Sequence, residues 1–437
     1  MDKVVNLAKR RGFIFPGSEI YGGLANSWDY GPLGVELKNN IKNEWWRRFV
    51  LRRSDMVGID AALIMNPRVW EASGHLKEFS DPLVECKKCH TRFRADIIDP
   101  LRDACPECGA KKSFTEASQF NLMFKTFVGP AEDKTNVAYF RPETAQAMFV
   151  NFKNVVDTTR KRLPFGIAQM GKAFRNEITP GNFIFRTREF EQMEIEYFVK
   201  EKEWEKYFEY WLKEMKQWLK DLGINNKKLH FEEIPEGERA HYSKRTIDIE
   251  YDFPFGKKEL YGLAYRGDFD LKNHMEKSGV DLRYTDPEAG EKFLPHVIEP
   301  TWGVDRSVLV AMLEAYNEED APTAEEGESE TRIVMNFPKW LAPVKVAVLP
   351  LSKKDELKKV AEPIYEELVQ KFACEYDETQ SIGKRYRRQD EIGTPFCVTV
   401  DFDSLKDKAV TVRDRDTMKQ ERIKIKDLSK YLDEKFL

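Results

Sequence analysis

Hydrophobic residues recur at helical spacing in several segments of the chain. Residues 35–51, which follow GPLG (residues 31–34), form one such segment, and residues 144–160 and 355–372 form two others. Apolar side chains three and four positions apart share one face of a helix, so these segments are predicted to be helices packed on a core. The apolar positions of the first are Val35, Leu37, Ile41, Trp45, Trp46 and Phe49, and a further stripe within residues 200–222 comprises Trp204, Tyr207, Phe208, Trp211, Met215 and Trp218.

Strand patterns surround these helices. Residues 118–198 are typical of strands apart from the helix at 144–160, and strand-like runs return at 246–252 and 259–265. FRNE (174–177) and FIFRTREF (183–190) flank a Thr-Pro-Gly-Asn turn, which predicts an antiparallel hairpin with an exposed loop. Its arms combine arginines and glutamates with aromatic residues. A guanidinium suits phosphate, and an aromatic ring suits a purine.

The pattern changes in the last hundred residues. Residues 317–331 are acidic and nearly free of large apolar groups, which predicts a solvated loop or linker. Strand and helix patterns then alternate from residue 345 to the end. This alternation predicts a small α/β domain with a mostly parallel core, beginning near Lys339.

Composition describes a globular protein with two or three domains. Of 437 residues, 41% are hydrophobic and 33% charged, and no apolar run approaches the ~20 residues that span a bilayer. The first residues, MDKVVNLAKRRGFIF, lack the apolar region of a secretory signal, so we expect a cytoplasmic protein without membrane contact. Because the net charge is −4, any nucleic-acid contact must use local basic patches.

Four cysteines form two CxxC pairs, Cys86 with Cys89 and Cys105 with Cys108. This spacing favours a zinc ribbon, in which two tight turns aim four thiolates at one ion and leave no open position. Gly109 follows the second pair, where such a turn needs a positive φ. Three alternatives remain: a haem attachment site at CKKCH, disulfides, and a site that is empty or holds iron.

Further carboxylates and arginines lie at the ends of predicted elements. Glu143, in RPETAQ (141–146), precedes a helix, Glu259 begins a strand, and GVDR (303–306) opens the helix after VIEP (297–300). Each also fits a structural role: Glu143 can favour a helix dipole, Asp305 can cap a helix, and Glu259 can be an edge-strand charge.

The order of these segments resembles dimeric glycyl-tRNA synthetases, a family of class II aminoacyl-tRNA synthetases. GPLG and its helix resemble motif 1, residues 174–196 resemble motif 2, and GVDR resembles motif 3. RPETAQ and VIEP favour the glycyl member. Residues 381–395 resemble the anticodon-binding domain shared with the histidyl, prolyl and threonyl enzymes, and the class I signatures HxGH and KMSKS do not occur.

The resemblance implies a two-domain architecture. Residues 1–338 would form an α+β catalytic domain on an antiparallel sheet, with a zinc-ribbon insertion at 84–112 and a helical insertion at 200–245. Residues 339–437 would form an α/β anticodon-binding domain. The motif 1 helix would build a homodimer, and the partners would be tRNA(Gly), glycine and ATP.

The implied activity is that of a glycine–tRNA ligase, using ATP with Mg²⁺ and a structural Zn²⁺. Arg175 would contact the α-phosphate and Arg186 the β- and γ-phosphates, while Phe190 and Arg306 would enclose adenine, making Arg175 and Arg306 the catalytic arginines. Glu259 would bind Mg²⁺ and Glu177 would contact the adenine edge. The remaining implied ATP contacts are Asn176, Phe185, Thr187, Arg188, Glu189, Leu260, Gly303, Val304 and Asp305.

Glycine offers only an ammonium, a carboxylate and the absence of bulk. The resemblance implies that Glu143, Glu194 and Glu299 surround the ammonium and that Arg94 contacts the carboxylate. A close-packed wall would exclude alanine by a clash, so no editing domain is expected. The remaining implied contacts are Phe190, Glu191, Gln192, Met193, Pro300, Thr301, Trp302 and Gly303. Trp302 stands where the family often has a small residue, and it would either narrow the pocket or face the core.

A basic cluster in the tail, formed by Lys384, Arg385, Tyr386, Arg387 and Arg388, would bind tRNA, although a solvated helix end gives the same pattern. Two other functions compete with glycine ligation. One is a catalytically inactive, nucleic-acid-binding relative, which is expected to lack Arg175, Arg186 and Arg306. The other is a class II enzyme for proline or threonine, which the carboxylate-rich pocket disfavours.

Overall fold

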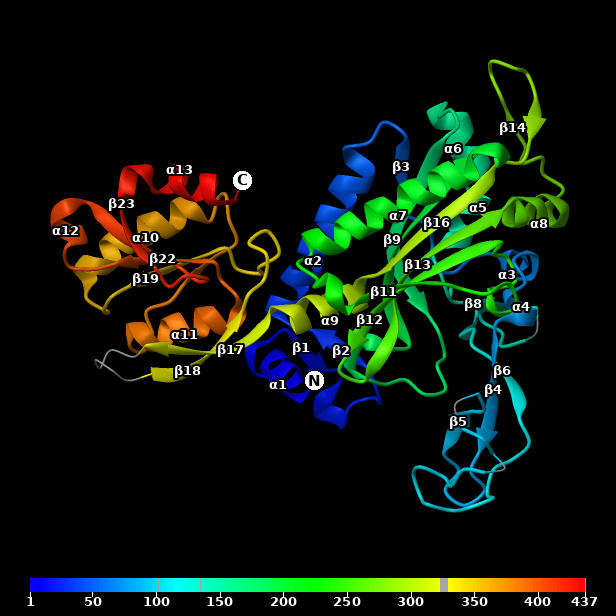
Figure 1. Cartoon of the computed structure of the whole chain (residues 1–437), viewed down its shortest axis with the longest axis horizontal. Helices are drawn as coiled ribbons and strands as arrows, with labels where there is room; N and C mark the ends of the chain where they lie inside the picture. Colours follow the sequence, from blue (N-terminus) through cyan, green and yellow to red (C-terminus); the bar gives the residue numbers. More distant parts are fainter. Residues whose placement is uncertain (97, 101, 134, 323–328, 437) are drawn as a thin grey trace.

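The computed structural model describes residues 1–96, 98–100, 102–133, 135–322 and 329–436. The two largest hydrophobic cores lie in different parts of the described chain. The larger lies on a central sheet built from residues before about 340, and the smaller joins residues 346–432. Figure 1 shows the two bodies side by side, with a slender arm leaving the larger one.

The central sheet has seven strands in the order β11-β12-β13-β16-β10-β9-β3. Neighbours are antiparallel except β3 and β9, which are parallel, so the predicted antiparallel sheet is confirmed. The bounds are β3 Met56–Ile59, β9 Phe165–Phe174, β10 Glu189–Val199, β11 Leu229–Glu233, β12 Arg245–Phe253, β13 Gly256–Gly267 and β16 His296–Gly303.

The predicted hairpin is correct in pairing but wrong at its tip. Strands β9 and β10 pair with Phe174 opposite Glu189, so the turn spans residues 175–188 instead of four residues. Phe183–Phe185 form a buried 3₁₀ turn, not a strand. Asn182 and Phe183 have φ values of +57° and +61°, which turn the chain inward and bury the two phenylalanines and Ile184.

Helices α2 (Pro32–Trp46), α7 (Trp204–Asp221) and α9 (Val304–Ala315) cover one face of the sheet. A π-helical turn, Arg47–Leu51, extends α2. Val35, predicted to be apolar core, lies on the outer side of α2 and is 39% exposed. Helices α5 (Ala145–Val150), α6 (Phe152–Thr159) and α8 (Phe269–Ser278) pack on the opposite face.

Residues 200–245 are not a helical insertion. Helix α7 packs its buried Phe208, Trp211 and Trp218 in the main core, and β11 is the edge strand of the central sheet. The segment therefore completes the sheet and its cover. The apolar stripe indicated the helix, but the short, half-exposed strand β11 has little hydrophobic signal.

The acidic segment 317–331 is also corrected where the structure describes it. Strands β17 (Tyr316–Pro322) and β18 (Ser329–Met335) form an antiparallel ribbon, with Glu319 opposite Arg332. Residues 323–328 lie outside the described part. The acidic composition of this segment predicted a loop, but the two strands pair across the ribbon and place an arginine opposite one of the glutamates.

The C-terminal sheet has the order β20-β19-β21-β22-β23. Strand β19 is parallel to β20 and β21, whereas β21, β22 and β23 are antiparallel, so the predicted parallel core is limited to three strands. The bounds are β19 Val346–Pro350, α10 Asp355–Leu368, β20 Cys374–Tyr376, α11 Ile382–Ile392, β21 Phe396–Val400, α12 Ser404–Asp407, β22 Ala409–Asp414, β23 Gln420–Lys424 and α13 Ile425–Phe436.

The arm is a three-stranded sheet of β5, β4 and β6 that carries the cysteine pairs at its end.

Among the described helices, none is both long and apolar enough to cross a membrane. The arm strands are β4 Ser80–Glu85, β5 Arg92–Arg94 and β6 Ser118–Asn121; the other short elements are α1 Asp2–Arg11, β1 Ile14–Pro16, β2 Trp28–Tyr30, α3 Pro67–Ala72, α4 His75–Glu78, β7 Lys125–Phe127, β8 Val137–Tyr139, β14 Tyr284–Thr285 and β15 Lys292–Phe293.

Candidate active site and metal centre

A cavity of about 350 Å³ lies on the sheet face opposite α2, α7 and α9. Strands β10, β13 and β16, the loop at residues 175–188 and the start of α9 supply its walls. It gathers residues that are far apart in the chain. The predicted residues that line it are Glu143, Arg175, Glu177, Phe185, Arg186, Thr187, Phe190, Glu191, Gln192, Glu194, Glu259, Leu260, Glu299, Thr301, Gly303, Asp305 and Arg306.

One end of the cavity combines arginines with aromatic rings. The Arg175 guanidinium lies 5.2 Å from the Phe190 ring centroid, and its Nε donates to the Pro142 carbonyl at 3.0 Å. The Arg306 guanidinium lies 4.5 Å from the ring centroid of Phe185. Both cations thus lie over aromatic rings, an arrangement suited to a polyphosphate and a planar base.

Arg306 also holds Glu259. Its Nη1 donates to the Glu259 carbonyl at 2.9 Å and lies 3.2 Å from the Glu259 carboxylate. Nearby, burial and the charges of Glu259 and Glu250 raise the pKa of Asp248 to about 7. Glu259 and Asp248 offer the hard oxygens that Mg²⁺ prefers beside a polyphosphate.

Carboxylates form the other end. Glu194 accepts from the Thr144 backbone amide at 3.1 Å and from the Thr144 hydroxyl, and Gln192 Nε2 donates to it at 2.9 Å. Glu143 lies 3.3 Å from His75 Nε2 and accepts from Gln146 Nε2 at 3.0 Å. The predicted acidic cluster is therefore assembled, from the start of α5 and the middle of β10.

A buried arginine that the sequence did not indicate completes this end. Arg266 donates to both oxygens of Glu299, at 3.1 and 2.9 Å, and to both oxygens of Asp270, at 2.7 and 2.8 Å. Its guanidinium also lies 3.6 Å from the Tyr242 ring centroid. Only 1% of Arg266 is exposed. One cation therefore neutralises part of an otherwise anionic pocket.

The cluster shifts the ionisation of its members in opposite directions. Burial raises the pKa of Glu299 to about 8, with Glu194 and Glu143 adding to the rise and Arg266 opposing it. Burial and the charge of Glu143 raise the pKa of Glu194. Burial acts the same way on Glu143, but His75 and Arg266 hold its pKa below the ordinary value. The pocket thus has more carboxyl groups than it can ionise.

Several predicted contacts lie elsewhere. Met193, Pro300 and Trp302 alternate with cavity residues along β10 and β16, so strand geometry points them to the opposite face, where Trp302 lies 5.4 Å from Trp45 between ring centroids. Val304 is buried in the same core. These four are corrected to core residues.

Arg94, predicted to contact the substrate carboxylate, lies in the arm. It pairs with Asp81 at 2.9 Å and Asp96 at 2.7 Å and does not line the cavity. Asn176, Arg188 and Glu189 also lie outside the lining. The Asn176 amide donates to the Leu122 carbonyl, and Arg188 reaches the Ala25 carbonyl.

Asp305 lines the cavity, but its carboxylate connects buried groups. It accepts from the Tyr30 hydroxyl at 2.5 Å and from the Glu191 backbone amide at 2.7 Å, and it lies 3.4 Å from Lys38 Nζ. Lys38 and Lys42 also pair with Glu191. Gly303, not Asp305, is the N-cap of α9. Asp305 therefore ties β2 and α2 to β10.

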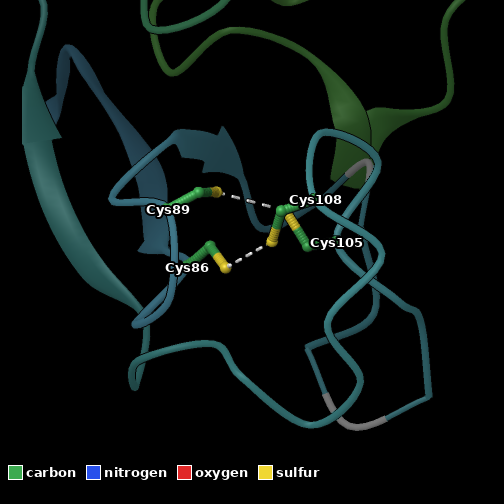
Figure 2. A group of neighbouring side chains, drawn as sticks. All are labelled: Cys86, Cys89, Cys105 and Cys108. Atoms are coloured by element: carbon green, nitrogen blue, oxygen red, sulfur yellow. Dashed lines mark hydrogen bonds between the residues drawn. The ribbon is translucent and has the colours of Figure 1, made fainter.

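The four cysteines converge at the end of the arm, as Figure 2 shows. Cys86 and Cys108 sulfurs are 3.7 Å apart, Cys89 and Cys105 sulfurs 3.6 Å apart, and all four lie within 4.8 Å of one another. Gly109 has φ +68°, as predicted. The Ser113 hydroxyl and the Cys89 backbone lower the pKa of Cys86 to about 6. Four convergent thiols at these separations fit a tetrahedral S₄ site for Zn²⁺.

The predicted basic cluster of the tail is mostly not a free surface. Arg385 is 1% exposed and donates to the carbonyls of Pro350, Asp377 and Leu351. The Tyr386 hydroxyl is hydrogen-bonded to the Thr399 hydroxyl, and the Arg413 guanidinium lies 4.8 Å from the Tyr386 ring centroid. Arg387 pairs with Glu330 and Arg388 with Asp377. Arg385 and Tyr386 are corrected to structural residues, and Lys384 remains exposed.

Similarity to known proteins agrees with this geometry. Residues 126–316 match the family described as tRNA synthetase class II core domain (G, H, P, S and T), and residues 345–435 match the anticodon binding domain. The fold and its cavity thus define a class II aminoacyl-tRNA synthetase with a C-terminal anticodon-binding domain.

Relatives narrow the family. The chain is 56% identical to the glycine–tRNA ligase of Caldanaerobacter subterraneus, and alignment covers all of the chain and 98% of that protein. The Geobacillus thermodenitrificans and Thermobifida fusca glycine–tRNA ligases are 56% and 53% identical over the whole chain and 97% and 98% of their own lengths. The chain belongs to the glycine–tRNA ligase family.

Proposed function

We propose that this protein joins glycine to tRNA(Gly) in two steps. The glycine carboxylate attacks the α-phosphorus of ATP, forming glycyl-adenylate and releasing pyrophosphate, and a terminal ribose hydroxyl of the tRNA then takes the glycyl group and releases AMP. The observation that carries the proposal is the cavity, with cations stacked on rings at one end and carboxylates at the other.

The carboxylate end suits an amino acid recognised by its ammonium. Glu143, Glu194 and Glu299 would bind that group, and Thr301, whose hydroxyl donates to Glu194 at 3.3 Å, lies beside them. The attacking carboxylate is already ionised, so the first step needs no general base. The chain contributes position and charge stabilisation.

The cationic end suits the nucleotide. Arg175 would hold the α-phosphate, Arg186 the outer phosphates, and Arg306 and Phe190 the adenine. Mg²⁺ would neutralise polyphosphate charge, with Glu259 as its proposed ligand. We further propose that residues 1–338 act as the catalytic domain and residues 339–437 as the anticodon-binding domain, in a cytoplasmic homodimer formed through α2. Lys384 would reach tRNA.

Glycine-dependent exchange of pyrophosphate into ATP tests this function. Exchange is expected with glycine and not with alanine, proline or threonine. The carboxylates would bind the ammonium, and a close-packed wall would exclude any side chain on the α-carbon. Exchange with proline or threonine but not with glycine would contradict the assignment of glycine as the substrate. No exchange with any amino acid, together with retained tRNA binding, would favour the inactive nucleic-acid-binding relative.

For the cysteine centre we propose structural Zn²⁺. Metal analysis of the purified protein is expected to find one zinc per chain, and Cys105→Ser to lose it. Because structural zinc contributes on the order of 10 kcal/mol to folding of its module, protease should then cut first within residues 84–112. Cys374→Ser, at a thiol outside the cluster, is the control. Undiminished zinc in Cys105→Ser would contradict the site.

A further inference from the structure

Glu196 is a buried acid that the proposed reaction leaves unused. Its side chain is fully buried, and neither carboxyl oxygen has a hydrogen-bond partner among the residues that the structure describes. A buried polar group without a partner destabilises a fold by about 1–3 kcal/mol. An aliphatic residue of the same size would avoid this destabilisation, so the acid invites a functional explanation.

Strand geometry places Glu196 behind the amino-acid end of the cavity. Successive side chains of β10 alternate between faces, so Glu196 points to the same face as Glu194. Strand β10 pairs with β16 so that Glu194 is opposite Thr301 and Tyr197 is opposite Ile298. The same register puts Glu196 opposite Glu299, with their side chains on one face. Like charges directly opposite each other are unfavourable.

The available positive charge is already engaged. Arg266 makes two hydrogen bonds to Glu299 and two to Asp270. The charged groups that act on Glu196 are Glu194 on its own strand, Glu299 on β16, Arg266 on β13 and Asp270 on α8. Glu143, Tyr242, His75 and His274 surround these groups. Glu196, Glu299 and Asp270 therefore lie around a single guanidinium, and burial disfavours ionisation of all three at once.

Resting on the proposed function, we propose that Glu196 and Glu299 form a coupled acid pair that retains a proton in the empty pocket, and that binding of the glycine ammonium expels this proton. Glu196 is thus a positioning residue. The charge of an ionised Glu196 would oppose ionisation of Glu299, so the pair retains a proton before substrate arrives. The ammonium then supplies the positive charge that lets Glu299 ionise, and the displaced proton passes to solvent.

The coupled acid pair makes glycine binding weaker at low pH. Burial, with Glu299 next, raises the pKa of Glu196, and the pKa of Glu299 is raised to about 8. Below that pH the empty site holds the proton, so glycine must displace it and binds more weakly. The KM for glycine is expected to fall as pH rises, by up to about tenfold per unit, and to level off near pH 8. The KM for ATP, which brings no ammonium, should not follow this profile.

Glu196→Gln tests the pair, since glutamine has the shape of the protonated acid but cannot ionise. Glu299 then loses its acidic partner, and the fall in glycine KM should move to lower pH. Calorimetry with a non-hydrolysable glycyl-adenylate analogue, in two buffers of different ionisation enthalpy, should find less proton release near neutral pH than in the unaltered protein. Asp286→Asn is the control, because Asp286 is also a buried carboxylate but pairs with Lys200, away from the cavity.

Three outcomes are distinguishable. A shifted glycine profile with an unchanged ATP profile supports the pair. A Glu196→Gln protein with unaltered glycine profile and unaltered proton release overturns it, since Glu196 would then hold its proton throughout. Failure to bind glycine or its adenylate in the unaltered protein would overturn the proposed function instead. Should Glu196→Gln fail to fold, proton release by the unaltered protein still decides, because its absence between pH about 6 and about 8 contradicts the linkage.

Discussion

Arg266→Met is expected to destabilise the catalytic domain by about 3–5 kcal/mol, because it leaves the buried Asp270 carboxylate without its cation and Glu299 without its hydrogen-bond donor. Denaturant unfolding should reveal a lower midpoint, and glycine-dependent pyrophosphate exchange should be lost even where the domain remains folded.

Arg245→Met is the matched control. Arg245 lies in the same sheet and also stacks on a ring, 4.3 Å from the Phe208 centroid, but its partners Glu209 and Glu233 are about half exposed. Exposed pairs contribute at most about 1 kcal/mol. Equal destabilisation by the two substitutions would contradict the special position of Arg266.

Arg306→Ala is expected to reduce glycine-dependent exchange by roughly 10²–10³-fold, the usual effect of removing one group that stabilises transition-state charge. The fold should be retained, because Arg306 is partly exposed at the cavity wall. Arg306→Lys keeps the charge but loses the planar contact with Phe185, so it should recover only part of the rate. Exchange assays with circular dichroism separate rate from folding.

Arg283→Ala is the control for Arg306, because Arg283 pairs with Asp281 at the surface and does not line the cavity. It should exchange at the unaltered rate. A fully active Arg306→Ala protein would remove Arg306 from the catalytic machinery while leaving the fold assignment in place.

The sequence predicted those parts of the site that lie in continuous motifs. Arg175, Phe190 and Arg306 could be placed because each belongs to a short segment whose order along the chain is distinctive. The cysteine centre was predictable for the same reason, since CxxC spacing is local geometry. The antiparallel sheet and both domains followed from hydrophobic periodicity and the resemblance together.

Residues that act through tertiary contact were missed. Arg266 comes directly after the predicted strand at 259–265, and nothing in the local sequence distinguishes it from a surface arginine. Only the fold brings Asp270 and Glu299 around it. Met193, Pro300 and Trp302 were predicted to line the pocket because they neighbour pocket residues in sequence, although alternation of side chains along a strand would have excluded them. Arg385 shows the converse limit, because charge alone does not tell a surface contact from a buried brace.

The Asp305 network ties the first fifty residues to the cavity. Tyr30 and Lys38 reach Asp305, which stands next to Arg306, and Asp305 accepts from the amide of Glu191, which stands next to Phe190. Detaching α2 would leave the buried carboxylates of Asp305 and Glu191 without their lysine partners, so α2 should not unfold independently of the cavity wall. Helix α2 and the cavity wall are therefore expected to unfold as a single cooperative unit, which keeps Arg306 in place until that unit opens.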